Sequence, residues 1–332
     1  MKILITAPFS ESCLKQLQDE GFVVDYRSWL ESGKLHMGES LLTILQDGNY
    51  DIVIVEGDEI KEPILEKVSL KLIGSVRGAP NNISVEVATA KRIPVLAVPG
   101  RNTLAVAELT MALMLNQVRH IKKAELLLKD DFFVDDFKDF ADIYAKLQGF
   151  ELNGRIVGIV GLGSIGFEVA KRLLPFGVSI LVYDPYVLQE RVDAVNAKVV
   201  DLDTLLKESD IVTIHCTPTE ETRRLIGARE FSLMKKTAIF INTARASITD
   251  ENALLDALRT GTIAGAGLDV FSMEPVDSDN IFLDLENVTV MPHMGSNTLE
   301  TIERQSRIIT DAILEFAQEK KPRNVMNPEV FD

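Results

Sequence analysis

The feature that most constrains this chain is a glycine-rich turn set between two apolar runs. Ile156 to Val160 is typical of a buried parallel strand, and Gly161-Leu162-Gly163-Ser164-Ile165-Gly166 follows directly. A helical stretch from Phe167 to Leu174 comes next, and a second apolar run, Val178 to Tyr183, ends on Asp184. Strand, G-x-G-x-x-G turn, helix, strand and acid in this order predict a unit that binds a dinucleotide.

Each part of this unit has a physical role. Gly161 allows the tight turn off the strand, Gly163 removes a side chain where a pyrophosphate approaches, and Gly166 lets the helix pack closely on the sheet. The first helical turn offers free N–H groups and a partial positive charge to phosphates. Asp184 can accept hydrogen bonds from both ribose hydroxyls and would repel a 2′-phosphate, so we expect NAD rather than NADP.

Length and composition narrow the class of protein. A chain of 332 residues is long enough for two domains with full cores. Its formal charge of −15 argues against nucleic acid or an anionic membrane as the partner. Cys13 and Cys216 lie far apart, so we expect two reduced thiols and no metal site. No apolar run is long enough to span a membrane, and residues 1–6 resemble a strand, which predicts a cytoplasmic protein.

Short apolar strands alternate with helical segments along the whole chain. This alternation predicts an α/β protein with doubly wound parallel sheets. The expected strands are Lys2–Thr6, Val23–Tyr26, Asp51–Val55, Leu70–Val76, Val95–Val98, Ile211–His215, Ala238–Asn242, Gly265–Val270 and Val288–Met291.

Two long helices and one acidic, aromatic stretch complete the pattern. We expect one helix from about Thr103 to Lys129 and a last helix from about Leu299 to Gln318, which can return the chain to the first domain. Residues 130–150 are rich in aspartate and phenylalanine, including Asp130, Asp131, Phe132 and Phe133. The favoured interpretation is a surface loop held by buried phenylalanines, and the alternative is a lid or a dimer arm.

Ligands of a doubly wound sheet bind outside the carboxyl ends of its strands, so residues just after strands are the site candidates. Arg245 follows the strand ending at Asn242, Glu274 follows the Gly265–Val270 strand, and His293 follows the Val288–Met291 strand. All three can reach one cleft. His215 also ends a strand, and we expect it to be structural or to lie on the cofactor side.

These stretches resemble the D-isomer-specific 2-hydroxyacid dehydrogenase family, in one register over almost the whole chain. The matching segments are Val98-Pro99-Gly100-Arg101-Asn102-Thr103, Val106-Ala107-Glu108, Asn242-Thr243-Ala244-Arg245, Ala266 to Phe271, Glu274-Pro275, Pro292-His293-Met294-Gly295-Ser296 and Pro328-Glu329. The resemblance implies reversible hydride transfer between NAD(H) and a small 2-oxo or D-2-hydroxy acid. It also implies a homodimer paired through the nucleotide domain.

The resemblance further implies two similar domains. Residues 101–299 would form the Rossmann NAD-binding domain, and residues 1–100 with 300–332 would form a discontinuous, flavodoxin-like substrate domain.

The family's catalytic residues map onto the three candidates. His293 would be the general acid in reduction and the base in oxidation, Glu274 would orient it, and Arg245 would bind the substrate carboxylate and keto oxygen. Asp269 would bind the nicotinamide carboxamide. The glycine turn and Asp184 would be joined by further cofactor contacts from Ser164, Ile165, Cys216, Thr217, Thr243 and Ala244.

The substrate loop departs from the family pattern. Arg77, Gly78 and Ala79 stand where the family's loop binds a carboxylate through backbone N–H groups, and Pro80 removes one donor. Arg77 is a candidate second anion contact, although it could instead pair with a nearby carboxylate. Glu56-Gly57-Asp58-Glu59 is acidic where bacterial phosphoglycerate dehydrogenases carry arginines. Alternatives therefore stay open: a phosphoglycerate dehydrogenase, a phosphite dehydrogenase, or an NAD(H)-sensing protein like the corepressors of this fold.

Overall fold

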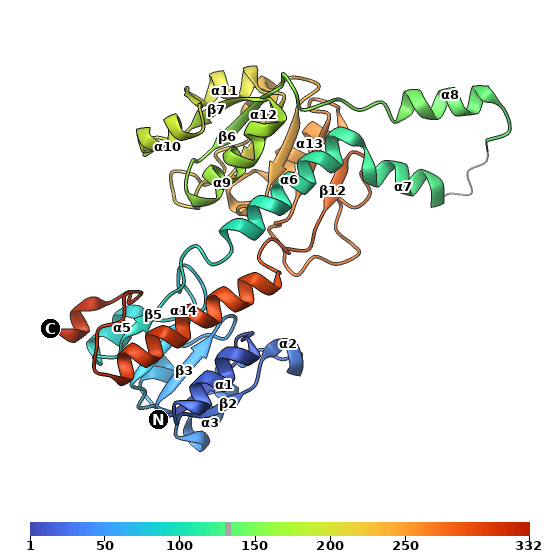
Figure 1. The fold of residues 1–332 in the computed structure, drawn as a ribbon. Coiled ribbons are helices and arrows are strands. Elements are labelled where there is room, and N and C mark those ends of the chain that lie inside the picture. Colours follow the sequence, from blue (N-terminus) through green and yellow to red (C-terminus); the bar gives the residue numbers. More distant parts are fainter. Residues whose placement is uncertain (130–133) are drawn as a thin grey trace. The chain divides into compact units, whose positions relative to one another are not determined.

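A computed structural model describes residues 1–129 and 134–332, in two compact units. Unit 1 comprises Met1–Arg101 with Asn297–Asp332, and unit 2 comprises Asn102–Ser296. Each unit contains its own parallel sheet, which confirms the predicted α/β class (Figure 1). Asp130, Asp131, Phe132 and Phe133 lie outside the described residues.

Among the described residues of unit 1, the sheet has the order β2-β1-β3-β4-β5 and every pairing is parallel. Its strands are β1 (Lys2–Ile5), β2 (Val23–Tyr26), β3 (Ile52–Val55), β4 (Leu72–Ser75) and β5 (Val95–Leu96). Its helices are α1 (Glu11–Asp19), α2 (Trp29–Ser32), α3 (Glu39–Gly48), α4 (Glu62–Leu65), α5 (Val85–Ala90) and α14 (Leu299–Ala317), with a short 3-10 turn, η3 (Pro328–Phe331).

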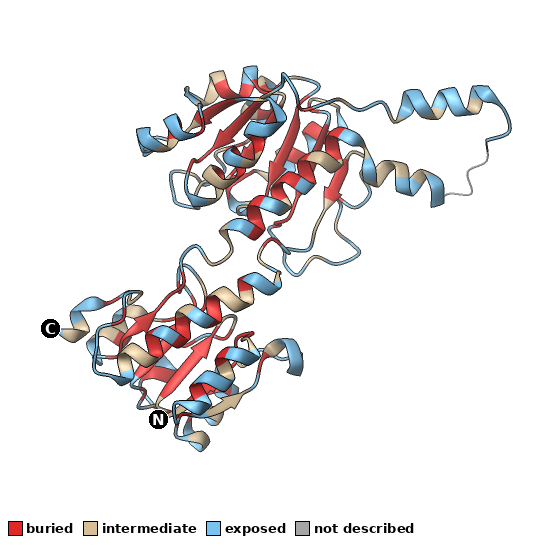
Figure 2. Ribbon diagram, viewed as in Figure 1, coloured by how far each residue is buried: buried red, intermediate tan, exposed pale blue. Residues whose placement is uncertain are grey.

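Helices cover both faces of this sheet, so its central strands are buried on both sides, whereas the edge strand β2 has no buried residue (Figure 2). One face packs against α1 and α14, with Ile309 and Ile313 of α14 in the core. The other face packs against α3, α4 and α5. Residues 324–327 then run antiparallel to β5, where the N–H of Met326 donates to Val95 and the Asn327 carboxamide accepts from the same residue. Unit 1 is thus built from both ends of the chain.

Within the described part of unit 2, the sheet has the order β12-β11-β10-β9-β6-β7-β8, again parallel throughout. Its strands are β6 (Ile156–Val160), β7 (Ser179–Tyr183), β8 (Lys198–Val199), β9 (Ile211–Ile214), β10 (Ile239–Asn242), β11 (Gly265–Leu268) and β12 (Val288–Val290). Its helices are α6 (Thr103–Arg119), α7 (Ile121–Lys129), α8 (Phe137–Lys146), α9 (Ser164–Leu173), α10 (Gln189–Ala194), α11 (Leu202–Glu208), α12 (Ala228–Leu233) and α13 (Glu251–Arg259), with 3-10 turns η1 (Leu174–Phe176) and η2 (Ala246–Ile248).

The expected helix from Thr103 to Lys129 is two helices, which corrects the prediction. His120 adopts a left-handed conformation with φ of 54°, and this ends α6. The Asn116 side chain then accepts a hydrogen bond from the N–H of Lys122 as α7 begins. α6 packs against α9 and strands β10, β11 and β12, whereas α7 has no buried residue.

The prediction for residues 130–150 is also wrong in the part that the structure describes. Residues 137–146 form helix α8, capped by the Asp136 carboxylate, which accepts the N–H groups of Lys138 and Asp139. Its aromatic residues are exposed rather than buried: Phe137 is 82% exposed and Tyr144 71%. Side-chain hydrophobicity therefore did not predict burial here.

Candidate active site

The glycine turn has the geometry that a pyrophosphate site needs. Gly161 has φ of 94°, and a Cβ there would lie 2.6 Å from the backbone nitrogen of Cys216. A Cβ on Gly166 would lie 2.1 Å from the carbonyl oxygen of Gly161, so only glycine allows α9 to pack this closely. By contrast, a Cβ on Gly163 would meet nothing within 4 Å. Gly163 therefore leaves open space in front of the turn, where a ligand can approach.

Helix α9 begins earlier than expected, at Ser164 instead of Phe167. Gly163 takes the N-cap position, so Ser164 and Ile165 lie in the first helical turn. The unpaired N–H groups of that turn carry the positive end of the helix dipole. Both residues are consequently placed to contact a phosphate through the backbone.

Asp184 lies next to the glycine turn, at the carboxyl end of β7. One of its carboxylate oxygens accepts the N–H of Leu162 at 2.8 Å, and the other accepts the N–H of Tyr186 at 2.9 Å. Each oxygen can accept more than one hydrogen bond, so both remain available to ribose hydroxyls. The two backbone bonds hold the carboxylate in place before any ligand binds.

Residues after β9 complete this side of the sheet. The His215 ring is hydrogen-bonded to Thr213 at 2.9 Å, and burial lowers the pKa of His215 to about 3, so the ring is neutral at physiological pH. Burial raises the pKa of the Cys216 thiol to about 11, which keeps it protonated and unreactive. Thr217 is exposed, and it follows these two residues at the carboxyl edge. The backbone of His215 and Cys216 lies against Gly161.

Three neighbouring strands bring the other candidates to the same edge of the unit 2 sheet. Asn242 of β10 is paired with Leu268 of β11, and Leu268 is paired with Val290 of β12. Arg245, Asp269 and His293 each follow one of these paired residues. Because the strands are parallel, their carboxyl ends meet at one edge, and the side chains that follow them gather there.

His293 and Glu274 form a hydrogen-bonded pair. The Nδ1 atom of His293 lies 2.7 Å from Oε2 of Glu274. The other carboxylate oxygen of Glu274 accepts the N–H of Phe271 at 3.0 Å, which fixes the carboxylate itself. The side chain of His293 is 40% exposed, so Nε2 remains free to meet a ligand or solvent. A ring held this way through Nδ1 presents Nε2 for proton transfer.

Asp269 holds the backbone that carries His293, a contact that the sequence did not reveal. Its carboxylate oxygens accept the N–H groups of Met294 at 2.7 Å and Gly295 at 2.9 Å. His293 has φ of 57°, and this left-handed turn precedes the two N–H groups that bond to the carboxylate. Asp269 is only 1% exposed, and burial is the largest influence that raises its pKa. Two residues that follow β11 thus hold His293: Asp269 bonds to the backbone of its loop, and Glu274 bonds to its ring.

Asn242 plays a similar part for Arg245, and sequence reasoning assigned it no role. Its buried carboxamide accepts the N–H of Ala244 at 3.0 Å and donates to the carbonyl oxygen of Arg245 at 3.1 Å. The hydroxyl of Thr243 is bonded to Thr110 of α6 at 2.8 Å, so Thr243 offers a ligand mainly its backbone. Arg245 is exposed, and its Nη1 donates to the carbonyl oxygen of Ala244 at 2.6 Å. Most of its five N–H donors remain for a ligand.

The expected substrate loop belongs to unit 1 and follows β4. Gly78 and Ala79 are exposed, whereas Arg77 is half-buried and donates from Nη1 to the Asn81 side chain at 2.9 Å. This bond gives Arg77 a neutral partner next to the loop. The N–H of Arg77 also donates to the hydroxyl of Ser75, which ties the loop to the end of the strand.

The acidic loop after β3 is largely engaged within unit 1. Glu56 forms an ion pair with Arg101 at 2.5 Å and accepts a hydrogen bond from the Trp29 indole at 3.2 Å. Asp58 is fully buried, and it accepts hydrogen bonds from the Thr6 hydroxyl and the His36 backbone. Trp29 thus helps to hold this loop in place.

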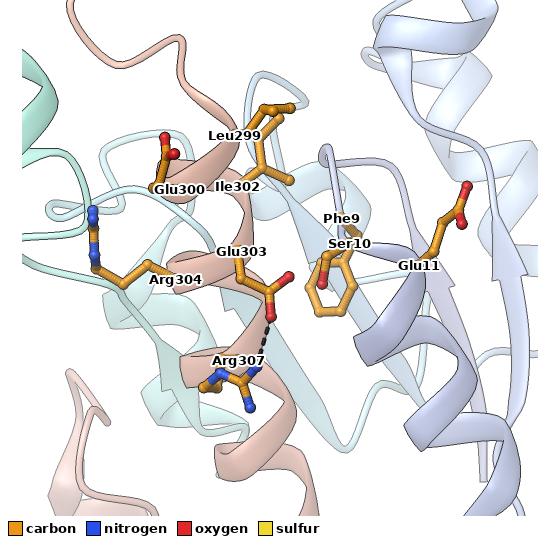
Figure 3. Close-up of a pocket in the computed structure, with 9 residues that line it drawn as sticks. All are labelled: Phe9, Ser10, Glu11, Leu299, Glu300, Ile302, Glu303, Arg304 and Arg307. Atoms are coloured by element: carbon orange, nitrogen blue, oxygen red, sulfur yellow. Dashed lines mark hydrogen bonds and ion pairs between the residues drawn. The ribbon is translucent and has the colours of Figure 1, made fainter.

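A cavity of about 680 Å³ lies elsewhere in unit 1, between the start of α1 and the first turns of α14 (Figure 3). Glu303 and Arg307 form an ion pair on its wall, and Phe9 and Ile302 supply apolar surface. None of the residues that line it is one of the site candidates named above. The cavity therefore marks no part of the predicted chemistry.

Within the described ranges, 1–129 and 134–332, no group of histidine, cysteine, aspartate or glutamate side chains could hold a metal ion. The same residues include no helix that is long and apolar enough to cross a membrane.

Comparisons with known proteins identify the family to which this chain is similar. The family model described as "D-isomer specific 2-hydroxyacid dehydrogenase, NAD binding domain" matches residues 111–295. A D-3-phosphoglycerate dehydrogenase from Archaeoglobus fulgidus is 35% identical over 329 residues, which cover 98% of this chain and 59% of that protein. A glyoxylate reductase from Thermococcus litoralis is 38% identical over 281 residues, 84% of either chain.

A solved structure extends the likeness to the whole fold. The TT0316 protein from Thermus thermophilus aligns with 98% of this chain and 100% of its own, with a TM-score of 0.84 and 30% identity. The expected resemblance is therefore confirmed: the chain belongs to the D-isomer specific 2-hydroxyacid dehydrogenase family, and unit 2 carries that family's NAD-binding domain.

Proposed function

We propose that this protein is an NAD-dependent dehydrogenase that interconverts a small 2-oxo acid and its D-2-hydroxy acid. The observation that carries the proposal is the His293–Glu274 pair, 2.7 Å apart, at the carboxyl edge of the sheet in the NAD-binding domain. Arg245 lies after a neighbouring strand at the same edge. An acid–base group and a carboxylate binder beside a nicotinamide site are what this reaction requires.

Proton transfer falls to His293 in this proposal. Nε2 of His293 donates a proton to the keto oxygen as the carbonyl carbon is reduced, and it takes the proton back in the reverse direction. Glu274 accepts from Nδ1, which fixes the tautomer and stabilises the ring while it is positively charged. NADH supplies the hydride when bound, so the protein's task is positioning and charge stabilisation.

Arg245 binds the substrate carboxylate. Its guanidinium is planar and permanently charged, so it can make two parallel hydrogen bonds to a carboxylate. The Asn242 carboxamide fixes the backbone around it, which orients the side chain at modest cost in entropy. Because Asn242 is buried and bonds to the backbone of both Ala244 and Arg245, the end of β10 sets the position of Arg245 in this proposal.

The structure favours an unphosphorylated substrate such as glyoxylate, hydroxypyruvate or a sugar-derived acid. Arg101 lies beside the loop after β3, and its ion pair with Glu56 neutralises its charge. Together with the exposed Glu59, this loop provides no net positive charge for a phosphate. The glyoxylate reductase from Thermococcus litoralis, 38% identical over 281 residues, supports this choice.

We also propose that the protein is a homodimer in which a second copy covers α7 and α8. Neither helix has a buried residue, and together they expose Ile121, Leu128, Phe137 and Tyr144 (Figure 2). The ring centroids of Phe137 and Phe140 lie 5.8 Å apart, which makes a continuous aromatic surface. Apolar patches of this kind on a monomer usually mark an interaction site.

The decisive experiment is NADH oxidation against a panel of acids, with His293→Gln beside the wild type. The panel holds glyoxylate, hydroxypyruvate, pyruvate and 3-phosphohydroxypyruvate, with phosphite and NAD as a separate arm. We expect turnover of an unphosphorylated acid that falls at least 100-fold in the variant, since general acid–base catalysis contributes about 10²–10⁴-fold. NADH binding without turnover of any acid would overturn the proposal. Turnover of phosphite would instead support the alternative of a phosphite dehydrogenase.

A further inference from the structure

A hydrogen bond joins the two loops that flank the glycine turn. Tyr186, in the loop after β7, donates from its phenol to a carboxylate oxygen of Glu221 at 3.2 Å. Glu221 belongs to the loop after β9. Since β7 and β9 are the two neighbours of β6 in the sheet, the bond spans the carboxyl end of the strand that carries the glycine turn.

The same two loops lie where an open α/β sheet of this kind holds the adenosine end of a dinucleotide. In an open α/β sheet the ligand occupies the crevice outside the carboxyl ends of the strands, at the point where the strand order reverses. Here that point lies at β6, between β7 and β9. Asp184 marks the ribose position, and it accepts the backbone N–H of Tyr186 at 2.9 Å. Tyr186 is therefore fixed beside the ribose position while its ring extends to the opposite loop.

Both partners suit a contact that breaks and re-forms. Tyr186 is 78% exposed, so the bond lies at the surface and its loss leaves no buried group unsatisfied. The hydrogen bond to Glu221 raises the pKa of Tyr186, so the bond favours the protonated phenol that donates it. Neither side chain belongs to the catalytic set of the proposed reaction.

We propose that Tyr186 and Glu221 form a latch across the adenosine end of the NAD site, which retains the bound cofactor and opens for its release. The latch rests on NAD binding, which the family establishes, and not on the identity of the substrate. The glycine turn and Asp184 would contact the cofactor directly, whereas the latch is a contact between two residues of the protein.

The test measures dissociation of NADH by stopped-flow fluorescence, with excess NAD to trap the free protein. Tyr186→Phe and Glu221→Ala each remove the bond, and we expect the dissociation rate to rise about threefold to tenfold, the range for one hydrogen bond. The double variant should dissociate no faster than either single variant, because both changes break one contact. Glu221→Gln keeps an acceptor and should match the wild type.

Glu220→Ala is the matched control, because it removes an adjacent exposed carboxylate but leaves the bond intact. Its dissociation rate should equal that of the wild type. A wild-type rate in Tyr186→Phe would overturn the latch, as would independent, multiplying effects of the two single changes. If Glu220→Ala raised the NADH dissociation rate as much as Glu221→Ala, loss of negative charge would explain the effect, and the latch would be overturned as well. Because only NADH is used, these results do not depend on turnover of any acid.

Discussion

Replacing Asp269 by asparagine is expected to slow catalysis by displacing His293. The native carboxylate accepts two backbone N–H groups, from Met294 at 2.7 Å and from Gly295 at 2.9 Å. Asparagine has one oxygen and one NH₂ group, so it can accept only one of these bonds and turns a donor toward the other N–H. The perturbation therefore acts on the loop of His293 and leaves the ring's bond to Glu274 in place.

The magnitude follows from the lost contact. A hydrogen bond to a charged group is worth about 1.5–3 kcal/mol, and each 1.4 kcal/mol corresponds to a factor of about ten in rate. If His293 reaches its working position only with the loop held, kcat should fall about 10- to 100-fold. Steady-state kinetics with the best 2-oxo acid gives kcat, and fluorescence titration gives the NADH dissociation constant.

These two measurements separate two roles for Asp269. A fall in kcat with unchanged NADH affinity supports the positioning role, whereas a large loss of NADH affinity supports direct contact with the nicotinamide carboxamide. A kcat within twofold of the wild type would refute the reasoning. Asp277→Asn, which changes an exposed aspartate in the segment before β12, is the matched control and should leave both quantities unchanged.

The same variant has a signature in stability against pH. Burial raises the folded-state pKa of Asp269 above its usual 3.8, so the unfolded chain loses this proton first as pH rises. This group therefore favours the folded state below pH 3.8, and that contribution is lost as pH rises from 3.8 through the folded-state pKa. Asp269→Asn removes the titration, so its stability deficit relative to the wild type should shrink over that window. Urea unfolding at several pH values measures the deficit, and a deficit that grows with pH contradicts the assignment.

Three further outcomes test other parts of the structure. Gly166→Ala should fail to fold or lose NADH binding, because its Cβ would lie 2.1 Å from a carbonyl oxygen. Gly163→Ala should fold normally, because its Cβ meets nothing within 4 Å, yet it should bind NADH at least tenfold more weakly, which calorimetry can measure. Asn242→Ala should raise the KM for the oxo acid about tenfold with little change in NADH affinity, and an unchanged KM would contradict its role. Phe137→Asp should convert the proposed dimer to a monomer in size-exclusion chromatography with light scattering, whereas Leu35→Asp, a change of an exposed leucine in unit 1, should not.

The architecture was predictable because most of its strands are buried on both faces. Ile52–Val55 is apolar throughout and Ile211–Ile214 is apolar except for Thr213, which is typical of parallel strands covered by helices. The strands Val23–Tyr26 and Ile156–Val160 have the predicted bounds, whereas the other predicted strands are one or two residues too long at one end or both. Apolar residues such as Val98 stay buried after pairing stops, which explains part of this excess. Strand β8 escaped prediction because it has two residues, both exposed at the sheet edge.

The point where α6 ends and the exposure of the aromatic residues in α8 were harder to predict. The break between α6 and α7 depends on the left-handed conformation of His120. Histidine adopts this conformation more readily than most residues, but a histidine in the sequence does not by itself predict it. The aromatic residues of α8 suggested burial, yet nothing in the described chain covers them. Their environment depends on what binds there, and a single sequence carries no direct signal for that.

In the candidate site too, features set by local sequence were predictable, whereas contacts between distant segments were not. Spacing within one segment predicted the glycine turn and Asp184, because their roles depend on local geometry. Contacts such as Asp269 with the His293 loop, or Tyr186 with Glu221, join segments that are adjacent only through strand order and register. Those contacts could not be predicted before the sheet was known, and the catalytic roles of Arg245, Glu274 and His293 remain predictions.

The discontinuous construction of unit 1 has a consequence for biosynthesis. Strands β1 to β5 are made first, but α14 and residues 324–327, which cover one face and the β5 edge, follow only after all of unit 2. At about 5–20 residues per second, the sheet of unit 1 waits roughly ten seconds or longer with apolar surface uncovered. Unit 2, whose residues are contiguous, can fold during this interval. We therefore expect nascent chains that stop before α14 to be the species that chaperones must protect from aggregation.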